Sequence, residues 1–132
     1  MDNPGSYVLA ALSLTTALTA QAQTATDALE GMTAVSLEAE FLYGSGGTSA
    51  LALVQTRHDG GNWRDIARFE FTTASATKVA NLSGLLSKAI TAYAALSTES
   101  VIDGMLGTEL RAVVTSVGVY ANTTLTVRAA AR

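Results

Sequence analysis

The sequence predicts an all-β protein, an antiparallel β-sandwich of about seven to nine strands with a jelly-roll-like or Ig-like arrangement. Three observations favour this fold class. Apolar and polar residues alternate over several short stretches, which is the period of a half-buried strand. Glycine-rich or asparagine-containing turns separate these stretches, and little of the chain has the spacing of an amphipathic helix.

The 132-residue chain has the length of one domain. We expect residues 8–132 to form a single β-sandwich and residues 1–7 to form a short N-terminal arm. The only proline, Pro4, lies within this arm, and the residue before a proline prefers an extended conformation. Neither an internal repeat nor a linker divides the rest of the sequence.

The stretch after the arm, VLAALSLTTALTAQA, has the outline of a secretory leader because an apolar run precedes small residues. A leader begins with positive charge, yet Asp2 precedes this run and the first Lys or Arg is Arg57. The run is also shorter than the about eighteen apolar residues that suggest a membrane span. Apolar and polar residues alternate from Leu12 onward, so we interpret the region as strands and expect no cleaved signal peptide.

Residues 33–43 form the clearest predicted strand, with Glu38 and Glu40 on its solvent-facing side. The glycine-rich residues 44–48 favour a tight turn, because glycine tolerates positive φ angles. Residues 49–57 alternate again. The region therefore predicts a hairpin.

A second predicted hairpin follows directly. Turn-forming residues at 58–62 connect the strand at 49–57 to a strand at 63–71. Alternation in the later strand is imperfect, because Ile66 has the opposite parity to its apolar neighbours. This irregularity predicts a bulge near Asp65.

Three segments follow the second hairpin. Residues 77–82 predict a strand, and residues 97–108, which contain two glycines, predict a long connection. Between them, the spacing of residues 88–96 suits either a strand or a short helix, and we favour the strand.

The chain closes with two further alternating stretches, residues 109–120 and residues 123–129. Ala121 and Asn122 lie between them, and asparagine tolerates the backbone conformation of a tight turn. The end of the chain therefore predicts a terminal hairpin.

Composition excludes several classes of function. The net charge is −3 and charged residues are only 14% of the chain, so the sequence lacks the basic face that nucleic acids or anionic membranes require. The chain has no cysteine, which excludes thiol catalysis, cysteine-ligated zinc and iron–sulfur clusters. We expect neither a nucleic-acid partner nor a membrane partner.

The residues whose side chains could take part in catalysis do not form a catalytic set. The only histidine, His58, lies beside Asp59 in a turn and lacks a nucleophile or further metal ligands nearby in the sequence. Glu38 and Glu40 have the alternation of an ordinary solvent-facing side of a strand. Residues 44–48 lack the lysine of a phosphate-binding loop. We therefore expect a protein that is not an enzyme and has no catalytic, metal or cofactor site.

Three arginines surround the second hairpin. On adjacent strands such residues usually pair with acids across the sheet. We expect Arg57, Arg64 and Arg68 to pair with acids such as Glu38, Glu40 and Glu70.

The only tryptophan, Trp63, follows a turn. If exposed, it could stack on a sugar together with Tyr43 and Tyr120. Its alternation with Ala67 and Phe69 instead favours a position in the core.

Two stretches carry a resemblance to a known group of proteins. Residues 46–71 contain a glycine–threonine turn, a strand, the sequence DGGNW and an aromatic strand, and residues 110–128 form the closing pair of strands. This pattern resembles small structural proteins of tailed bacteriophages and prophages. The similarity extends from about Leu18 to Arg128 with a less matched insert at residues 85–107, and it implies a virion component of the head or neck module.

The leading hypothesis is a capsid decoration or cement protein in the virion, assembled in the cytoplasm of a bacterial host. It would bind the major capsid protein or other virion subunits, and we expect a homo-oligomer. The alternatives are a neck or tail component, such as a connector or tail terminator, and a carbohydrate-binding β-sandwich module. We expect the arm and the long connection to supply the contacts. The expected contact residues are Asp2, Asn3, Pro4, Tyr7, Ser100, Val101 and Ile102.

Overall fold

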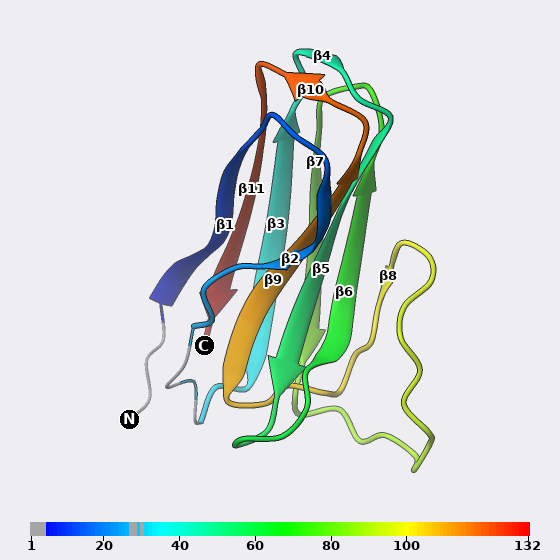
Figure 1. Ribbon diagram of the computed structural model, residues 1–132. Coiled ribbons are helices and arrows are strands. Elements are labelled where there is room, and N and C mark those ends of the chain that lie inside the picture. Colours follow the sequence, from blue (N-terminus) through cyan, green and yellow to red (C-terminus); the bar gives the residue numbers. More distant parts are fainter. Residues whose placement is uncertain (1–4, 27–28, 30) are drawn as a thin grey trace.

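The computed structural model describes residues 5–26, 29 and 31–132, and it confirms the antiparallel β-sandwich (Figure 1). The described residues form eleven strands and no helix. The first sheet has the order β1 (Gly5–Leu14), β11 (Thr123–Ala131), β3 (Ala34–Leu42), β7 (Ala76–Ser83). The second has the order β2 (Leu18–Ala22), β9 (Glu109–Val117), β5 (Ser49–Arg57), β6 (Arg64–Phe71), β8 (Ser100–Val101). A short pair, β4 (Ser45–Gly46) and β10 (Tyr120–Ala121), joins the layers at one end.

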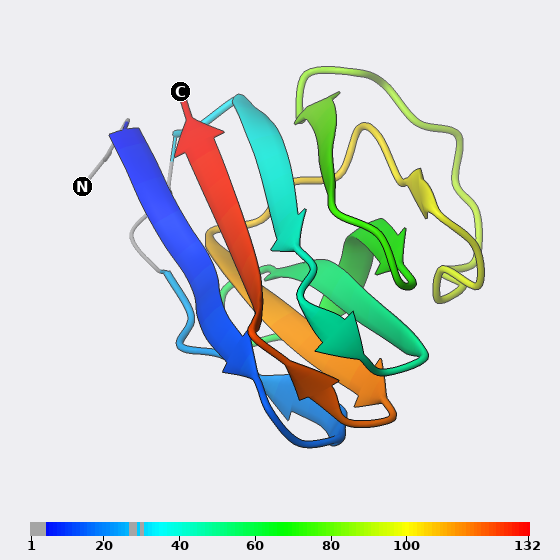
Figure 2. The same ribbon diagram turned by 90° about the horizontal axis from the view of Figure 1, so that it is seen from above.

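The strand count exceeds the expected range because β4, β8 and β10 have only two residues each. The two sheets lie face to face when seen from above (Figure 2), and the longer strands β1, β3, β5, β6, β9 and β11 turn buried apolar side chains toward the other layer. An aromatic cluster fills one part of the core. The ring of Phe41 stacks on Phe71 of the opposite sheet at a centroid distance of 5.0 Å, and Tyr120 meets it edge-on at 5.7 Å.

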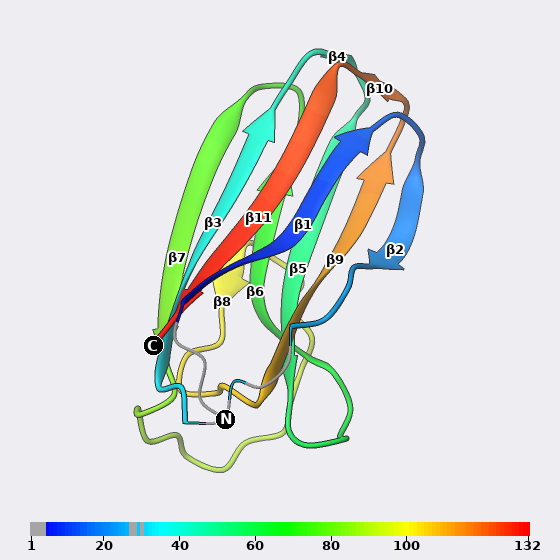
Figure 3. The ribbon, with the colours of Figure 1, turned by 90° about the vertical axis from the view of Figure 1, so that its left-hand side faces the viewer.

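The first predicted hairpin is wrong. Residues 33–43 and 49–57 do form strands β3 and β5, but β3 belongs to the first sheet and β5 to the second. The glycine-rich turn crosses between the layers, as Figure 3 shows. A polar and apolar alternation is the same whichever layer a strand joins, so the local pattern could not identify the partner strand.

The terminal hairpin is wrong for the same reason. Strand β9 pairs with β2 and β5 in the second sheet, whereas β11 pairs with β1 and β3 in the first. The turn residue Asn122 does adopt a positive φ of 51°. The two crossings support each other, because Tyr120 pairs with Gly46 and Ala121 pairs with Ser45.

The second hairpin and its bulge are confirmed. Strands β5 and β6 pair directly, and Val54 pairs with Ala67 whereas Gln55 pairs with Asp65. Ile66 is therefore the extra residue of the bulge, and its side chain is buried.

The strand predicted at residues 88–96 is wrong, and so is its helical alternative. Residues 84–99 form a long loop between β7 and β8 without strand or helix. Most apolar residues of this segment are exposed, so burial selects neither periodicity. The predicted strand at residues 77–82 is confirmed as part of β7.

Of the expected arm at residues 1–7, the structure describes only residues 5–7, and these lie in a strand. Strand β1 begins at Gly5, which pairs with Ala131, so residues 5–7 belong to the first sheet. Its register shifts between Val8 and Ala10, which marks a second bulge. Within the described part of the chain, no helix is long and apolar enough to cross a membrane.

Candidate functional site

The contact residues expected from the sequence lie in three different settings. Asp2, Asn3 and Pro4 lie outside the described residues. Tyr7 lies in β1 and packs partly buried against the core. In the third group, Ser100 and Val101 form β8, the edge strand of the second sheet, and Ile102 comes directly after it.

This third group is held by main-chain pairing. Ser100 pairs with Arg68 and Val101 with Ala67, and the Ile102 amide donates to the carbonyl of Ile66 at 2.8 Å. The predicted connection at residues 97–108 thus begins with residues paired to β6. The loop that projects from the sandwich comes earlier, at residues 84–99, where the sequence predicts a strand over most of its length.

The loop at residues 84–99 carries apolar side chains into solvent. Leu85 is 75% exposed, Leu86 is 53% exposed, and Ile90 is fully exposed. Large apolar side chains in a long loop have no stabilising role in the chain that carries them unless they contact something else. We call these three residues the apolar loop patch.

The C-terminal half of this loop is fastened to strand β6 through Asp65. The backbone amide of Asp65 donates to the hydroxyl of Tyr93 at 2.9 Å, and the Leu96 amide donates to its carboxylate at 3.1 Å. The Arg68 guanidinium donates to the Leu96 carbonyl at 2.9 Å, and the Arg64 guanidinium lies over the Tyr93 ring at 4.8 Å. The later half of the loop is therefore fixed to the second sheet, and the apolar loop patch lies in the earlier half.

A second attachment follows at Glu99. Its carboxylate accepts from the Glu70 amide at 2.9 Å and forms an ion pair with Lys78 at 2.7 Å. Burial raises the pKa of this carboxyl, but the two hydrogen bonds and the Lys78 charge outweigh it, so the pKa lies below its ordinary value.

Charged and aromatic residues gather on the outer side of the second sheet. The Arg57 guanidinium holds the Glu109 carboxylate with two hydrogen bonds, at 2.6 and 3.1 Å. This pairing lowers the pKa of Glu109 and raises the pKa of Arg57. The indole of Trp63 lies beside both Arg57 and Arg111, whose guanidinium carbons are 4.7 and 4.4 Å from the ring centroid. We call Arg57, Trp63, Glu109 and Arg111 the arginine–tryptophan cluster.

Trp63 is half-buried on this outer side, so its predicted place in the core is wrong. The bulge at Ile66 shifts the parity of the strand, so residues before it do not continue the inward series of Ala67 and Phe69. The sequence indicated the bulge but not its consequence for Trp63.

Arg111 differs from Arg57 because no acid pairs with it among the described residues. Its Nε donates to the Gln55 side-chain oxygen at 2.8 Å, and the Gln55 amide nitrogen donates to Asp65 at 2.8 Å. Burial lowers the pKa of Arg111, and the neighbouring charge of Arg57 lowers it further.

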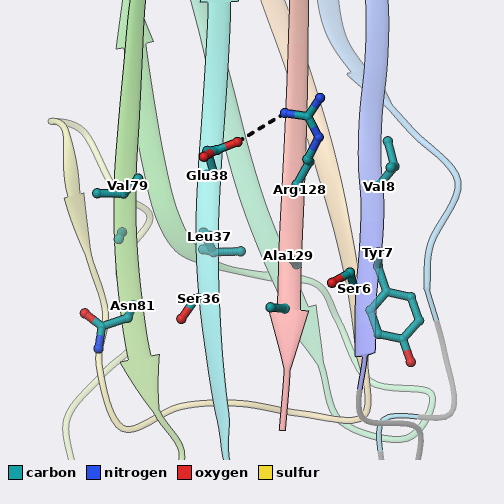
Figure 4. Close-up of a pocket in the computed structure, with 12 residues that line it drawn as sticks. Ser6, Tyr7, Val8, Ser36, Leu37, Glu38, Val79, Asn81, Arg128 and Ala129 are labelled. Carbon is teal, nitrogen blue, oxygen red and sulfur yellow. Dashed lines mark hydrogen bonds and ion pairs between the residues drawn. The ribbon is translucent and has the colours of Figure 1, made fainter.

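The outer side of the first sheet has a different character. A hollow of about 570 Å³ lies across its four strands between Val8 and Val79 (Figure 4). Arg128 forms ion pairs with Glu38 at 3.1 Å and with Glu40 at 3.4 Å beside it. The charges of this hollow therefore satisfy one another.

Two of the three central arginines pair with acids. Arg57 pairs across the sheet, as predicted, but with Glu109 of β9, and Arg68 pairs with Glu70 of its own strand at 2.6 Å. Arg64 lies over Tyr93 instead. Arg57 does not pair with Glu38 or Glu40 because β3, which carries these glutamates, and β5, which carries Arg57, lie in different sheets.

The remaining sites from the sequence do not assemble. His58 is an exposed turn residue, and the described residues contain no cluster of three or more His, Cys, Asp or Glu side chains that could hold a metal ion. Tyr120 is buried and donates to the Thr72 carbonyl at 2.7 Å, and burial raises its pKa. Because Tyr43 packs against Tyr120 at the opposite end of β5 from Trp63, the three rings do not form one sugar-binding platform.

No protein-family model matches the chain, and neither the curated proteins nor the solved structures gave a match.

Proposed function

We propose that this protein is a structural component of a bacteriophage virion, a decoration protein that binds the head lattice through protein–protein contacts. The apolar loop patch is the observation that carries the proposal. Leu85, Leu86 and Ile90 are held in solvent by a loop whose later residues are fastened to β6. The occupant that would bury these side chains is another protein subunit.

The general character of the surface supports the same proposal. Charged residues are 14% of the sequence, and interfaces between subunits are depleted of charge at their centre. A repeated subunit on a symmetric particle gains binding strength from many identical weak contacts, so a small patch suffices. The resemblance of residues 46–71 and 110–128 to structural proteins of tailed phages gives the setting.

The proposal is tested on particles purified from the producing bacterium. We expect the protein to be present in hundreds of copies per particle by quantitative gel, as on a capsid lattice. About six or twelve copies would instead assign it to the neck. Its absence from particles would overturn the proposal.

The contact itself is tested by a charge placed in the apolar loop patch. Ile90→Asp should weaken binding to particles that lack the protein by about tenfold or more, because a desolvated carboxylate would oppose burial. Val119→Asp is the matched control, since Val119 is 67% exposed in a turn at the opposite end of the sandwich. Equal binding by both variants would show that the patch is not the contact.

A further inference from the structure

We infer that the arginine–tryptophan cluster is a second docking point, at which Arg111 and Trp63 receive a carboxylate from an acidic segment of the partner subunit. The inference rests on the proposed function for the identity of the partner. It names the chemistry of the group that binds, which the apolar loop patch leaves open.

The first support is an unbalanced charge. Two guanidinium groups lie within 5 Å of one indole ring, and the single acid of the cluster, Glu109, is held by Arg57 with two hydrogen bonds. Arg111 retains a full positive charge beside another cation. A partly buried arginine of this kind is stabilised most by an incoming anion.

The second support is preorganisation. Gln55 accepts from Nε of Arg111 and is itself held by Asp65, which also fastens the loop at residues 84–99 through Leu96. Among the described residues, the only hydrogen bond of Arg111 comes from its Nε, so its two terminal nitrogens keep their donors for a ligand. A carboxylate fits that pair of donors in a bidentate manner.

The third support is the nature of the residues. Tryptophan and arginine are enriched among the interface residues that contribute most to binding, and the indole face gives the incoming acid an apolar wall. The cluster is connected by Gln55 and Asp65 to the loop at residues 84–99. The carboxylate of Asp65 therefore positions both the cluster and the later half of the loop.

The test uses the fluorescence of Trp63, which is the only tryptophan in the chain and lies within the proposed site. A tetraglutamate peptide with blocked termini should produce a saturable change in this fluorescence below about 10 mM, and raised salt should weaken it. A tetraglutamine peptide should have no effect. If tetraglutamate gives no saturable change, or if inorganic phosphate binds equally well, the inference of a carboxylate site is overturned.

Substitutions identify the group that binds. Arg111→Gln should weaken tetraglutamate binding by about tenfold or more, and Arg111→Lys should restore only part of it because lysine lacks the paired donors. Arg128→Gln is the matched control, since Arg128 already has acids on the opposite outer side. Unchanged binding by Arg111→Gln, with a wild-type urea midpoint, would overturn the assignment.

The inference and the proposed function can fail separately. Ile90→Asp should reduce particle binding but leave tetraglutamate binding unchanged, because the apolar loop patch does not contain the cluster. If Arg111→Gln lowers tetraglutamate binding but particles never contain the protein, the carboxylate site stands and the virion proposal fails. If particle binding depends on Ile90 but tetraglutamate never binds, only the present inference fails.

Discussion

The two outer sides of the sandwich have the same alternation of apolar and polar residues, but they differ in how their charged side chains are paired. On the first sheet, Arg128 of β11 lies between Glu38 and Glu40 of the neighbouring strand, and each charge has a partner within the sheet. On the second sheet, Arg111 of β9 lies opposite Gln55, and none of the described acids pairs with it.

The comparison shows that the polar side of a sheet can either pair its charges internally or leave them to bind another molecule. Where cross-strand neighbours are opposite in charge, the surface is satisfied by its own chain and needs no further contact. Where a cation contacts only an amide and an indole, as Arg111 does, its remaining hydrogen-bond donors can bind a group of another molecule. The loop at residues 84–99 runs from β7 of the first sheet to β8 of the second, and its later half is fastened to Asp65 of the second sheet.

The largest loss of stability is expected from a substitution in the hydrophobic core between the two sheets. Phe41→Ala removes a fully buried ring that stacks on Phe71, so we expect unfolding to become easier by about 3–5 kcal/mol in urea denaturation. Leu42→Ala is the control, because Leu42 is the next residue on β3 and is 52% exposed. It should cost less than about 1 kcal/mol. Similar costs for the two variants would contradict the inner and outer assignment of β3.

A smaller effect should be confined to the second side. Asp65→Ala removes the carboxylate that accepts from Gln55 and Leu96, so the loop should detach locally and stability should fall by about 1–3 kcal/mol. Trypsin should then cleave after Lys88 several times faster than in the original chain. Asp59→Ala in the exposed turn should leave this rate unchanged. A resistant loop in Asp65→Ala would mean that other contacts hold it.

The smallest effect concerns pH and again belongs to the second side. Because Arg57 lowers the pKa of Glu109 below 4.5, the ionised carboxylate stabilises the fold above that value, and this stability is lost as the pH falls through the lower folded pKa. Glu109→Gln should therefore flatten the decline of the urea midpoint between about pH 5 and about pH 3. Arg57→Gln should flatten it similarly. An unchanged slope in both variants would show that this pair does not contribute to acid sensitivity.

Much of the local structure could be predicted because it depends on neighbours in the sequence. The alternation at residues 33–43 and 49–57 and the irregularity near Asp65 each reflect a local preference, and the structure has strands and a bulge there. The candidate site was harder to predict from the sequence. Arg111 shows no unusual signal in the sequence, because the lack of an acid beside it depends on which strand lies next to β9. A better treatment of the bulge at Ile66 would have placed Trp63 on the outer side.

Most strands, their turns and the low charge of the chain follow from the sequence, since period-two alternation and glycine conformation act over a few residues. Tertiary packing instead sets the crossing of the turns at residues 44–48 and 121–122 between layers and the loop at residues 88–96. It also leaves Arg111 without a partner among the described acids. The physical reason is that alternation defines which side of a strand is buried but not which strand lies beside it. That choice depends on packing between residues far apart in the chain.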